Sequence, residues 1–411
     1  MGRILVAVAC IVALTSAVPF SRTPRLASDP ITAWSLAASE AATATKMSPF
    51  RTPISLAIVH LAMYDAVNAV TQDREPYVAK VAVVRPSSPH AAAIEAGYQV
   101  LLAEFPAELA QLQAKHTALL AEVPDGPAKE NGVTVGASAA SQLLAARAND
   151  GRKSERPHTP GSGAGVWIPT PPAFNAVSTA FLASVIPFTM TTVSQFRPAG
   201  PPPLGSVKWA EDFNEVKTLG GKFSAARTHE QTATALFWEP LASTVWPVTI
   251  RRLAAEHALD LPSSAHFQAA AFAAFADALI SCWDAKVHFN FWRPVTAIQH
   301  GEPDGNDRTG ADANWEPLAV TPDFPEYPSG HTCATAAVAH TIEAFFPRIP
   351  IPARQARTGE ERIYQRAADV VAEVIEARML LGVHFRSADA DGAEMGRRIA
   401  AQIQRDRFRK R

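Results

Sequence analysis

The sequence predicts an all-α protein. Alanine is abundant, alternation of β-branched residues is sparse, and apolar residues recur at helical spacing along several segments. With 411 residues, 47% of them hydrophobic, the chain can bury a large core in one domain or two. Its formal net charge of −1 lacks the basic excess that nucleic-acid binders carry, so we expect no nucleic-acid partner.

The N-terminus is typical of a secretory signal. Arg3 provides a short positive region, residues 4–14 form a compact apolar core, and Thr15-Ser16-Ala17 provide small residues for cleavage. A membrane anchor is the alternative, but this apolar run is short for a membrane span. We therefore expect a secreted or periplasmic protein that loses residues 1–17 as a signal peptide and has no transmembrane domain afterwards.

An N-terminal helical half is expected at residues 28–206. Its expected helices occupy residues 31–70, with a break at 47–49, and residues 89–104, 107–122 and 127–150. His60 and Asp65 lie on the second helix, where a buried histidine and a packing carboxylate are favoured over catalytic groups. Residues 151–206 are rich in Pro, Gly, Ser and Thr, but five aromatic residues recur through them. We therefore expect a long loop packed on a surface and not a flexible linker.

A C-terminal helical half is expected at residues 207–411. Its expected helices are 208–219, 229–238, 245–259, 266–292, 332–346, 359–381 and 392–405. Asp277 and Asp284 interrupt the longest apolar stretch, which argues against a membrane span there. Cys282 and Cys333 remain after signal removal. An oxidising compartment permits them to pair, and two buried thiols are the open alternative.

The first of three chemical motifs in this half is a pair of cations. Lys286 and Arg293 are seven residues apart, which would put both on nearly one face of a helix ended by Pro294, with Trp283 on the same face. Two cations among aromatic residues are costly to bury without an anion. The alternative is an ordinary surface pair whose aliphatic stems cover apolar area.

The other two motifs lie at helix ends. Pro328-Ser329-Gly330-His331 precedes an expected helix, where Ser329 can cap and the free N–H groups favour an anion. Arg378 closes a later helix, Gly382 is a plausible left-handed residue, and His384 follows; a cation completing the helix dipole is the simpler explanation there. Together the motifs supply three cations, neutral donors and two histidines, which suits a tetrahedral or trigonal-bipyramidal oxyanion.

The order K-x6-R-P, P-S-G-H and R-x5-H resembles the signature of the vanadium-dependent haloperoxidase and type 2 phosphatidic acid phosphatase superfamily. Four longer segments resemble its bacterial haloperoxidase-like branch: P-F-R-T-P-I-S-L-A-I-V-H-L-A-M-Y-D-A-V-N-A-V, W-I-P-T-P-P, R-T-H-E-Q-T and F-P-E-Y-P-S-G-H. The resemblance thus covers most of the mature chain. It implies a helical bundle of the vanadium haloperoxidase and acid phosphatase type.

The resemblance also implies roles for individual residues. Vanadate, or phosphate as the alternative occupant, would be held through its oxygens by Lys286, Arg293, Ser329, Gly330 and Arg378. His384 would be the axial ligand of the vanadium, or the phosphorylated nucleophile of a phosphatase, and His331 would be the acid–base residue. Trp283 and Phe324 resemble residues that line a halide pocket, with plain aromatic packing as the alternative.

One position departs from the family pattern. Relatives often carry an acid four residues after the final histidine, where this chain has Ala388 with Asp389 beside it. Because an outer partner sets the tautomer and basicity of a histidine ligand, either Asp389 reaches His384 or another group replaces it. Glu230 is a further acid with a loose resemblance to such a partner.

The resemblance implies a secreted vanadate-dependent haloperoxidase that uses hydrogen peroxide, halide and a small organic acceptor. The alternative is an acid phosphatase or phosphotransferase that works through a phosphohistidine at the same site. A third hypothesis is a secreted binding protein with an inactive anion site, and Ala388 is the feature that supports it.

Overall fold

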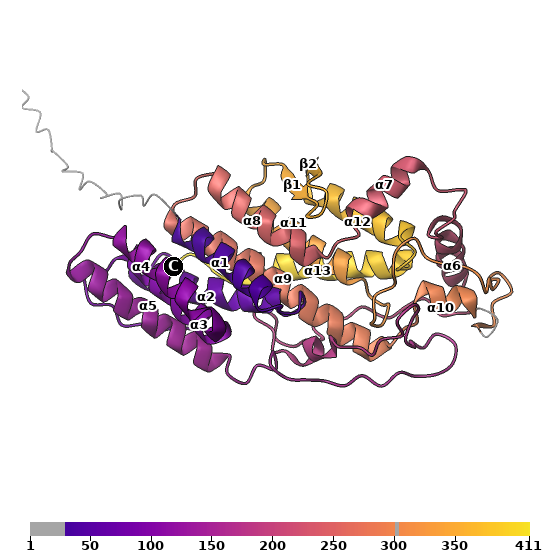
Figure 1. The fold of residues 1–411 in the computed structure, drawn as a ribbon, viewed down its shortest axis with the longest axis horizontal. Helices are drawn as coiled ribbons and strands as arrows, with labels where there is room; N and C mark the ends of the chain where they lie inside the picture. The colour runs from indigo at the N-terminus through magenta and orange to yellow at the C-terminus, as the bar shows by residue number, and fades with distance from the viewer. Residues whose placement is uncertain (1–28, 301–303) are drawn as a thin grey trace, which may run out of the picture.

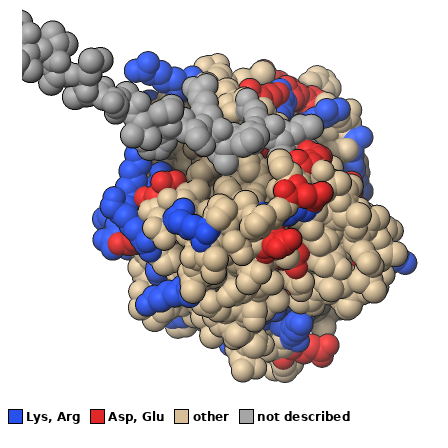
Figure 2. Space-filling view, turned by 90° about the vertical axis from the view of Figure 1, so that its left-hand side faces the viewer, with Lys and Arg blue, Asp and Glu red and all other residues tan. Residues whose placement is uncertain are grey.

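The computed structural model describes residues 29–300 and 304–411, which form an elongated assembly of packed helices (Figure 1). The expected signal at residues 1–17 lies outside the described residues and stays a prediction. Seen from the end at the left of Figure 1, basic and acidic side chains both dot a mostly uncharged surface (Figure 2). The mixed charge on this face agrees with the balanced composition.

The N-terminal helices form one layered group at the left of Figure 1. They are α1 (Pro30–Ala44), α2 (Thr52–Thr71), α3 (Pro89–Glu104), the short 3₁₀ helix η1 (Pro106–Glu108), α4 (Leu109–Ala121) and α5 (Pro127–Ala146). Asp29 and Ser88 cap α1 and α3 with side-chain oxygens, and a proline follows each cap. The middle helix of the group, α3, packs against both α2 and α5.

The rest of the chain supplies the other helices and one small hairpin. These elements are η2 (Ala180–Ser184), α6 (Val207–Leu219), α7 (His229–Phe237), α8 (Ala242–Glu256), α9 (Leu261–Phe289), α10 (Pro294–Gln299), α11 (Gly330–Phe345), β1 (Ile351–Arg354), β2 (Glu361–Tyr364), α12 (Ala367–Leu380) and α13 (Arg386–Asp406). Among the described residues the fold is therefore almost wholly helical, and the predicted all-α class is confirmed.

The core is organised around α9, which packs against α2 on one side and against α11 and α13 on another. Its alanine-rich sequence lets neighbouring helices approach closely, and one continuous apolar cluster includes buried residues from both expected halves. Both α2 and α9 are long and apolar enough to cross a membrane by length and composition, yet both are buried inside the fold. Asp65 on α2 accepts backbone N–H bonds from Tyr77, Val78 and Ala79, so its role is structural, as expected.

The segment 151–206 wraps along the body of the molecule. Of its aromatic residues, Trp167, Phe181, Phe188 and Phe196 are buried and Phe174 is exposed. The two acids that interrupt α9 hold this segment in place. Asp277 accepts the N–H groups of Phe188 and Thr189 at 2.6 and 2.7 Å, and Asp284 forms a forked ion pair with Arg197. These carboxylates therefore anchor a loop, which explains charged groups in an otherwise apolar helix.

Two sequence-based expectations about element boundaries are wrong near the motifs. Pro294 does not end the long helix: α9 stops at Phe289, Asn290 takes the left-handed conformation with φ of 46°, and Pro294 opens α10. Arg293 therefore lies outside α9, and the argument that it shares a helical face with Lys286 does not hold. The two cations converge because the chain turns back between the helices.

The expected helix at 359–381 begins too early. Residues before α12 instead form the antiparallel hairpin β1–β2, with Ile351 opposite Tyr364 and Arg354 opposite Glu361. Strands of four residues carry too few alternations of apolar and polar residues to predict a hairpin. The helix-favouring residues that follow the hairpin led to an expected helix that starts too early in the chain. The hairpin matters because its connecting loop reaches the cavity described below.

Candidate active site

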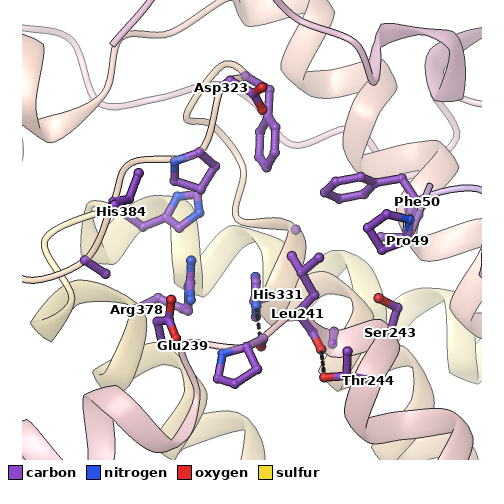
Figure 3. Close-up of a pocket in the computed structure, with 18 of the residues that line it drawn as sticks. Pro49, Phe50, Glu239, Leu241, Ser243, Thr244, Asp323, His331, Arg378 and His384 are labelled. Carbon is purple, nitrogen blue, oxygen red and sulfur yellow. Dashed lines mark hydrogen bonds between the residues drawn. The ribbon is translucent and has the colours of Figure 1, made fainter. Parts of the chain in front are cut away.

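The three motifs meet at one cavity of about 490 Å³. Figure 3 shows the side chains of His331, Arg378 and His384 on one side of it and those of Pro49 and Phe50 on the other. The site residues come from the end of α9, the start of α10, the start of α11, the end of α12 and the turn before α13. Five segments distant in sequence therefore build one site.

Lys286, in the last turn of α9, is fully buried beneath the cavity. Its ammonium group donates to the carbonyls of Pro325 and Glu326 at 2.9 and 2.8 Å. An ammonium has three protons, so one donor is left for another acceptor. Burial, with a smaller contribution from the charge of Arg293, lowers the pKa of Lys286 to about 8. The group is thus still cationic at neutral pH.

Arg293 is also fully buried. Its Nε donates to the Phe324 carbonyl and its Nη1 to the Val383 carbonyl, both at 2.8 Å. Its Nη2 has no hydrogen-bond partner among the described residues. Burial lowers the pKa of Arg293 to about 9. A buried guanidinium fixed on two sides, with one nitrogen free, is prepared to receive an oxyanion.

Arg378 completes the group of cations. It lies in the last turn of α12, where Gly382 follows in the expected left-handed conformation with φ of 74°. Its Nη1 donates to the Trp238 carbonyl at 3.1 Å, while its buried Nε lacks a partner among the described residues. Burial lowers the pKa of Arg378 to about 10. Three cations are buried close together, and each has an N–H group without an acceptor. Because buried charge is costly unless it is paired, an anion at this place would stabilise them.

Ser329 and Gly330 open α11, as the sequence predicts for a helix start. The Ser329 hydroxyl does not cap the helix, and it has no hydrogen-bond partner of normal geometry among the described residues. The Ser329 N–H donates to the Ala388 carbonyl at 2.9 Å, and a Cβ at Gly392 would lie 2.6 Å from the Ser329 carbonyl oxygen. Close packing of α13 thus fixes the start of α11 and places the Ser329 hydroxyl beside the Asp389 carboxyl of α13.

The two histidines hold different tautomers. His384 Nδ1 lies 2.8 Å from Glu326 Oε1, which also accepts the Phe385 N–H, so Oε1 is an acceptor and Nδ1 carries the proton. His384 Nε2 lies 3.3 Å from Arg293 Nη1, a group that can only donate, so Nε2 presents its lone pair. Burial, followed by the charges of Arg293, Lys286 and Arg378, holds the pKa of His384 well below its usual range.

His331 follows Gly330 and is half-buried at the cavity wall. Its Nε2 lies 3.1 Å from the Pro240 carbonyl oxygen, which can only accept, so Nε2 carries the proton and Nδ1 is free of it. Burial and the charge of Arg378 lower the pKa of His331 well below its usual range. The neutral ring therefore offers a basic nitrogen beside three cations.

Glu326 is the acid that contacts His384, a residue that the sequence argument did not single out. It lies three positions before Ser329 and is fully buried, and burial raises its pKa to about 8. Asp389 does not take this role. It is buried on α13, neither carboxylate oxygen has a hydrogen-bond partner of normal geometry among the described residues, and burial raises its pKa well above the usual range. Of the two sequence-based alternatives, replacement by another group is the one observed.

Glu230 is not part of the site. It lies in the exposed first turn of α7, whose start at Thr228 forms a capping box with Gln231. Its position explains the R-T-H-E-Q segment as a helix start, so the expectation of a carboxylate near the histidine was wrong there. Cys282 and Cys333, whose pairing the sequence left open, are free buried thiols that contact backbone carbonyls of Pro328 and Ala278.

The chain resembles known proteins in both sequence and fold. The family model for the second helical-bundle domain of vanadium chloroperoxidase matches residues 266–409, the part that carries all three motifs. The vanadium chloroperoxidase of Curvularia inaequalis is 31% identical over 145 residues, which cover 30% of this chain and 24% of that protein. The match thus spans about a quarter of the relative's length. Residues 266–409 thus match the second helical-bundle domain of the vanadium chloroperoxidase type.

Solved structures extend the likeness to the whole fold. A bacterial vanadium-dependent iodoperoxidase superposes with a TM-score of 0.79 at 21% identity, covering 94% of this chain and 98% of that one. A holo-type bacterial vanadium-dependent chloroperoxidase superposes with a TM-score of 0.66 at 20% identity, covering 87% and 93%. At these identities the structural likeness concerns the fold, so the predicted helical-bundle architecture is confirmed.

Aromatic side chains form the wall of the cavity next to the cations. Trp283 and Phe324, the expected pocket residues, are buried with ring centroids 5.1 Å apart. Lys286 Nζ lies 5.2 Å and Arg293 Cζ 4.9 Å from the Phe324 ring centroid. A Cβ at Gly330 would lie 3.1 Å from the Trp283 ring, so the glycine permits this close contact. Both aromatic residues line the cavity.

Proposed function

We propose that this protein is a vanadate-dependent haloperoxidase that oxidises halide with hydrogen peroxide. The observation that carries the proposal is the set of unused donors around His384 Nε2. Lys286 has one proton left over, Arg293 Nη2 and Arg378 Nε have no partner among the described residues, and the Ser329 hydroxyl faces the Asp389 carboxyl. Buried donors without partners are rare in folded proteins, and here three of them belong to cations whose charges act on His384.

This donor set fits vanadate. Vanadate is a compact oxyanion whose oxygens suit guanidinium and ammonium donors, and whose central atom accepts a nitrogen ligand. We assign its oxygens to Lys286, Arg293, Arg378, Ser329 and the Gly330 N–H group, and the vanadium to His384 Nε2. The role of the cations is to balance the charge of the oxyanion in a site that excludes water.

When bound, vanadate would act as a Lewis acid that polarises peroxide. The protein contributes proton handling and position. The hydrogen bond from His384 Nδ1 to Glu326 keeps the proton on Nδ1, so the lone pair of Nε2 is available for coordination. His331, with Nε2 bonded to the Pro240 carbonyl, has Nδ1 available to take a proton from peroxide and return it to the departing oxygen. Trp283 and Phe324 shield the reacting centre from bulk water.

The test of this proposal is a two-arm assay on one preparation. We expect vanadate-loaded protein to brominate a phenolic dye with peroxide and bromide, with a rate that saturates with vanadate and is inhibited competitively by phosphate. The second arm measures hydrolysis of an aryl phosphate by vanadate-free protein. Hydrolysis without bromination would support the phosphatase instead. If both arms are silent while vanadate still binds, the protein is an inactive anion-binding member of the family.

A further inference from the structure

The cavity at the oxyanion site is larger than the oxyanion, peroxide and halide need. Its volume is about 490 Å³. A water molecule accounts for roughly 30 Å³ of the liquid, so an oxyanion, a peroxide molecule and a halide ion together would leave about half of this space unfilled. Cavities of roughly 300–1,000 Å³ are the size that proteins use for organic ligands. The unexplained volume is the first reason to look for another occupant.

Most of the cavity wall is apolar. Away from the cations, the main apolar residues that line it are Pro49, Phe50, Leu241, Phe275, Leu279 and Phe324. Polar groups gather near the Glu239–Arg357 ion pair, whose arginine is largely exposed and comes from the loop between β1 and β2. The apolar part of the cavity, called the chamber below, thus lies between the polar groups near the Glu239–Arg357 ion pair and the buried cations. Such a space suits a neutral, apolar molecule that enters from solvent.

The wall also contains a cluster of three aromatic rings that are tilted or edge-on to one another. Phe50 lies 5.0 Å from Trp283 and 5.7 Å from Phe324, measured between ring centroids, and the three rings contact one another. Aromatic groups prefer stacked or edge-on contact with other aromatic rings at such distances. A flat aromatic ligand would find partners here that an aliphatic one would not.

The segment that carries Phe50 is held firmly in place. Phe50 lies in the turn between α1 and α2, and its neighbour Arg51 donates to the Arg152 carbonyl and stacks 3.8 Å over the Phe181 ring. Both partners belong to the segment 151–206. The N-terminal half therefore contributes a fixed wall, which makes the chamber a preformed site.

We propose that this chamber binds an electron-rich aromatic acceptor, of the size of a naphthol, and that halogenation takes place on the bound molecule. The binding step follows from the chamber alone, while the halogenation step rests on the proposed haloperoxidase function. Peroxide, halide and a proton yield hypohalous acid and water. The aromatic ring then forms the carbon–halogen bond as the oxygen–halogen bond breaks, and the ring proton leaves with the hydroxide as a second water.

The chain offers a matched pair of variants for the test. Leu241→Trp places a large side chain in the chamber from a half-buried position before α8, and Leu241→Ala enlarges the same place. Leu236→Trp makes the same change on the exposed face of α7, outside the cavity. Circular dichroism and thermal unfolding of all three establish that each variant is folded.

Binding of 2-naphthol to vanadate-free protein, measured by calorimetry, is the first readout. We expect saturable binding by the wild type and the Leu236→Trp variant, and an affinity lower by about tenfold or more in Leu241→Trp because its indole occupies the ligand's volume. Leu241→Ala should retain binding. If the wild type does not bind naphthol, or Leu241→Trp binds it as the wild type does, the proposal is wrong.

The second readout separates this proposal from the proposed function. Iodide oxidation to triiodide needs no organic acceptor, so we compare naphthol bromination with triiodide formation in each vanadate-loaded variant. The ratio of the two rates should fall by about tenfold or more in Leu241→Trp and stay unchanged in Leu236→Trp. Wild-type product isomers should also differ from those of free hypobromite. Naphthol binding without any halide oxidation would overturn the haloperoxidase function and keep the binding site.

Discussion

Replacing His384 by alanine should weaken vanadate binding by more than about 100-fold, beyond the 10- to 100-fold loss typical when only an outer partner of a ligand is removed. The expectation follows from the tautomer. His384 Nε2 presents a lone pair next to Arg293, and its Nδ1 proton is fixed by Glu326. Without the imidazole only the charged donors remain, and they bind an oxyanion by electrostatic attraction and hydrogen bonds alone.

Vanadate titration by calorimetry or ⁵¹V NMR measures this loss, and phosphate provides an internal control. Phosphate uses the same donors but needs no nitrogen ligand, so its affinity should fall much less than that of vanadate. His331→Ala is the companion variant. It should retain vanadate while peroxide-dependent turnover falls by about 10²- to 10⁴-fold, the usual contribution of acid–base catalysis. Tight vanadate binding by His384→Ala would refute the assigned ligand.

The second large effect concerns two buried acids with opposite expected outcomes. Glu326→Ala should weaken vanadate binding by about 10- to 100-fold, because His384 loses the acceptor that fixes its orientation and tautomer. Asp389→Asn also removes a carboxylate near the cations, but Asp389 has no hydrogen bond to His384 among the described residues. Either acid opposes anion binding by its charge only in its ionised form, and the raised pKa values of both acids reduce that charge near neutral pH, so on charge alone removing either acid leaves anion binding equal or tighter. We therefore expect equal or tighter binding in Asp389→Asn.

The sign of the effect separates position from charge. If both variants bind vanadate more tightly, Glu326 acts only as a charge, and its hydrogen bond to His384 has no part in binding. A structural readout supports the affinity measurement: ¹⁵N chemical shifts of His384 should report a proton on Nδ1 in the wild type and in Asp389→Asn, and a mixture of tautomers in Glu326→Ala. Restoration of the Nδ1 tautomer by Glu326→Gln would confirm that an acceptor oxygen suffices.

Much of the fold follows from local sequence because the helices are long and regularly apolar. The breaks at α1–α2 and the cap at Thr228 could be predicted from residues adjacent to them. The hairpin β1–β2 could not, because its strands are short and their pairing is decided by contacts across the chain. The end of α9 was missed because Asn290 adopts a left-handed conformation that its neighbours do not indicate.

The site residues also divide into those that a local motif predicts and those that depend on contacts between distant parts of the chain. Lys286, Ser329, Arg378 and the two histidines could be predicted because each lies in a recognisable motif, and the structure brings them to one cavity. Glu326 stands inside the segment F-P-E-Y-P-S-G-H, but its partner is 58 residues away along the chain. The missing acid at position 388 showed that a substitute was needed. Only the three-dimensional arrangement shows which acid supplies it.

The central claim is that His384 Nε2 binds the central atom of an oxyanion while His331 handles protons. A crystal structure of the protein grown with vanadate tests this most directly. The account predicts density for the oxyanion with its central atom bonded to His384 Nε2 and its oxygens near Arg293 Nη2, Arg378 Nε and Ser329 Oγ, while His384 Nδ1 keeps its hydrogen bond to Glu326. Vanadium bonded to His331, or vanadate bound outside this cavity, would contradict it.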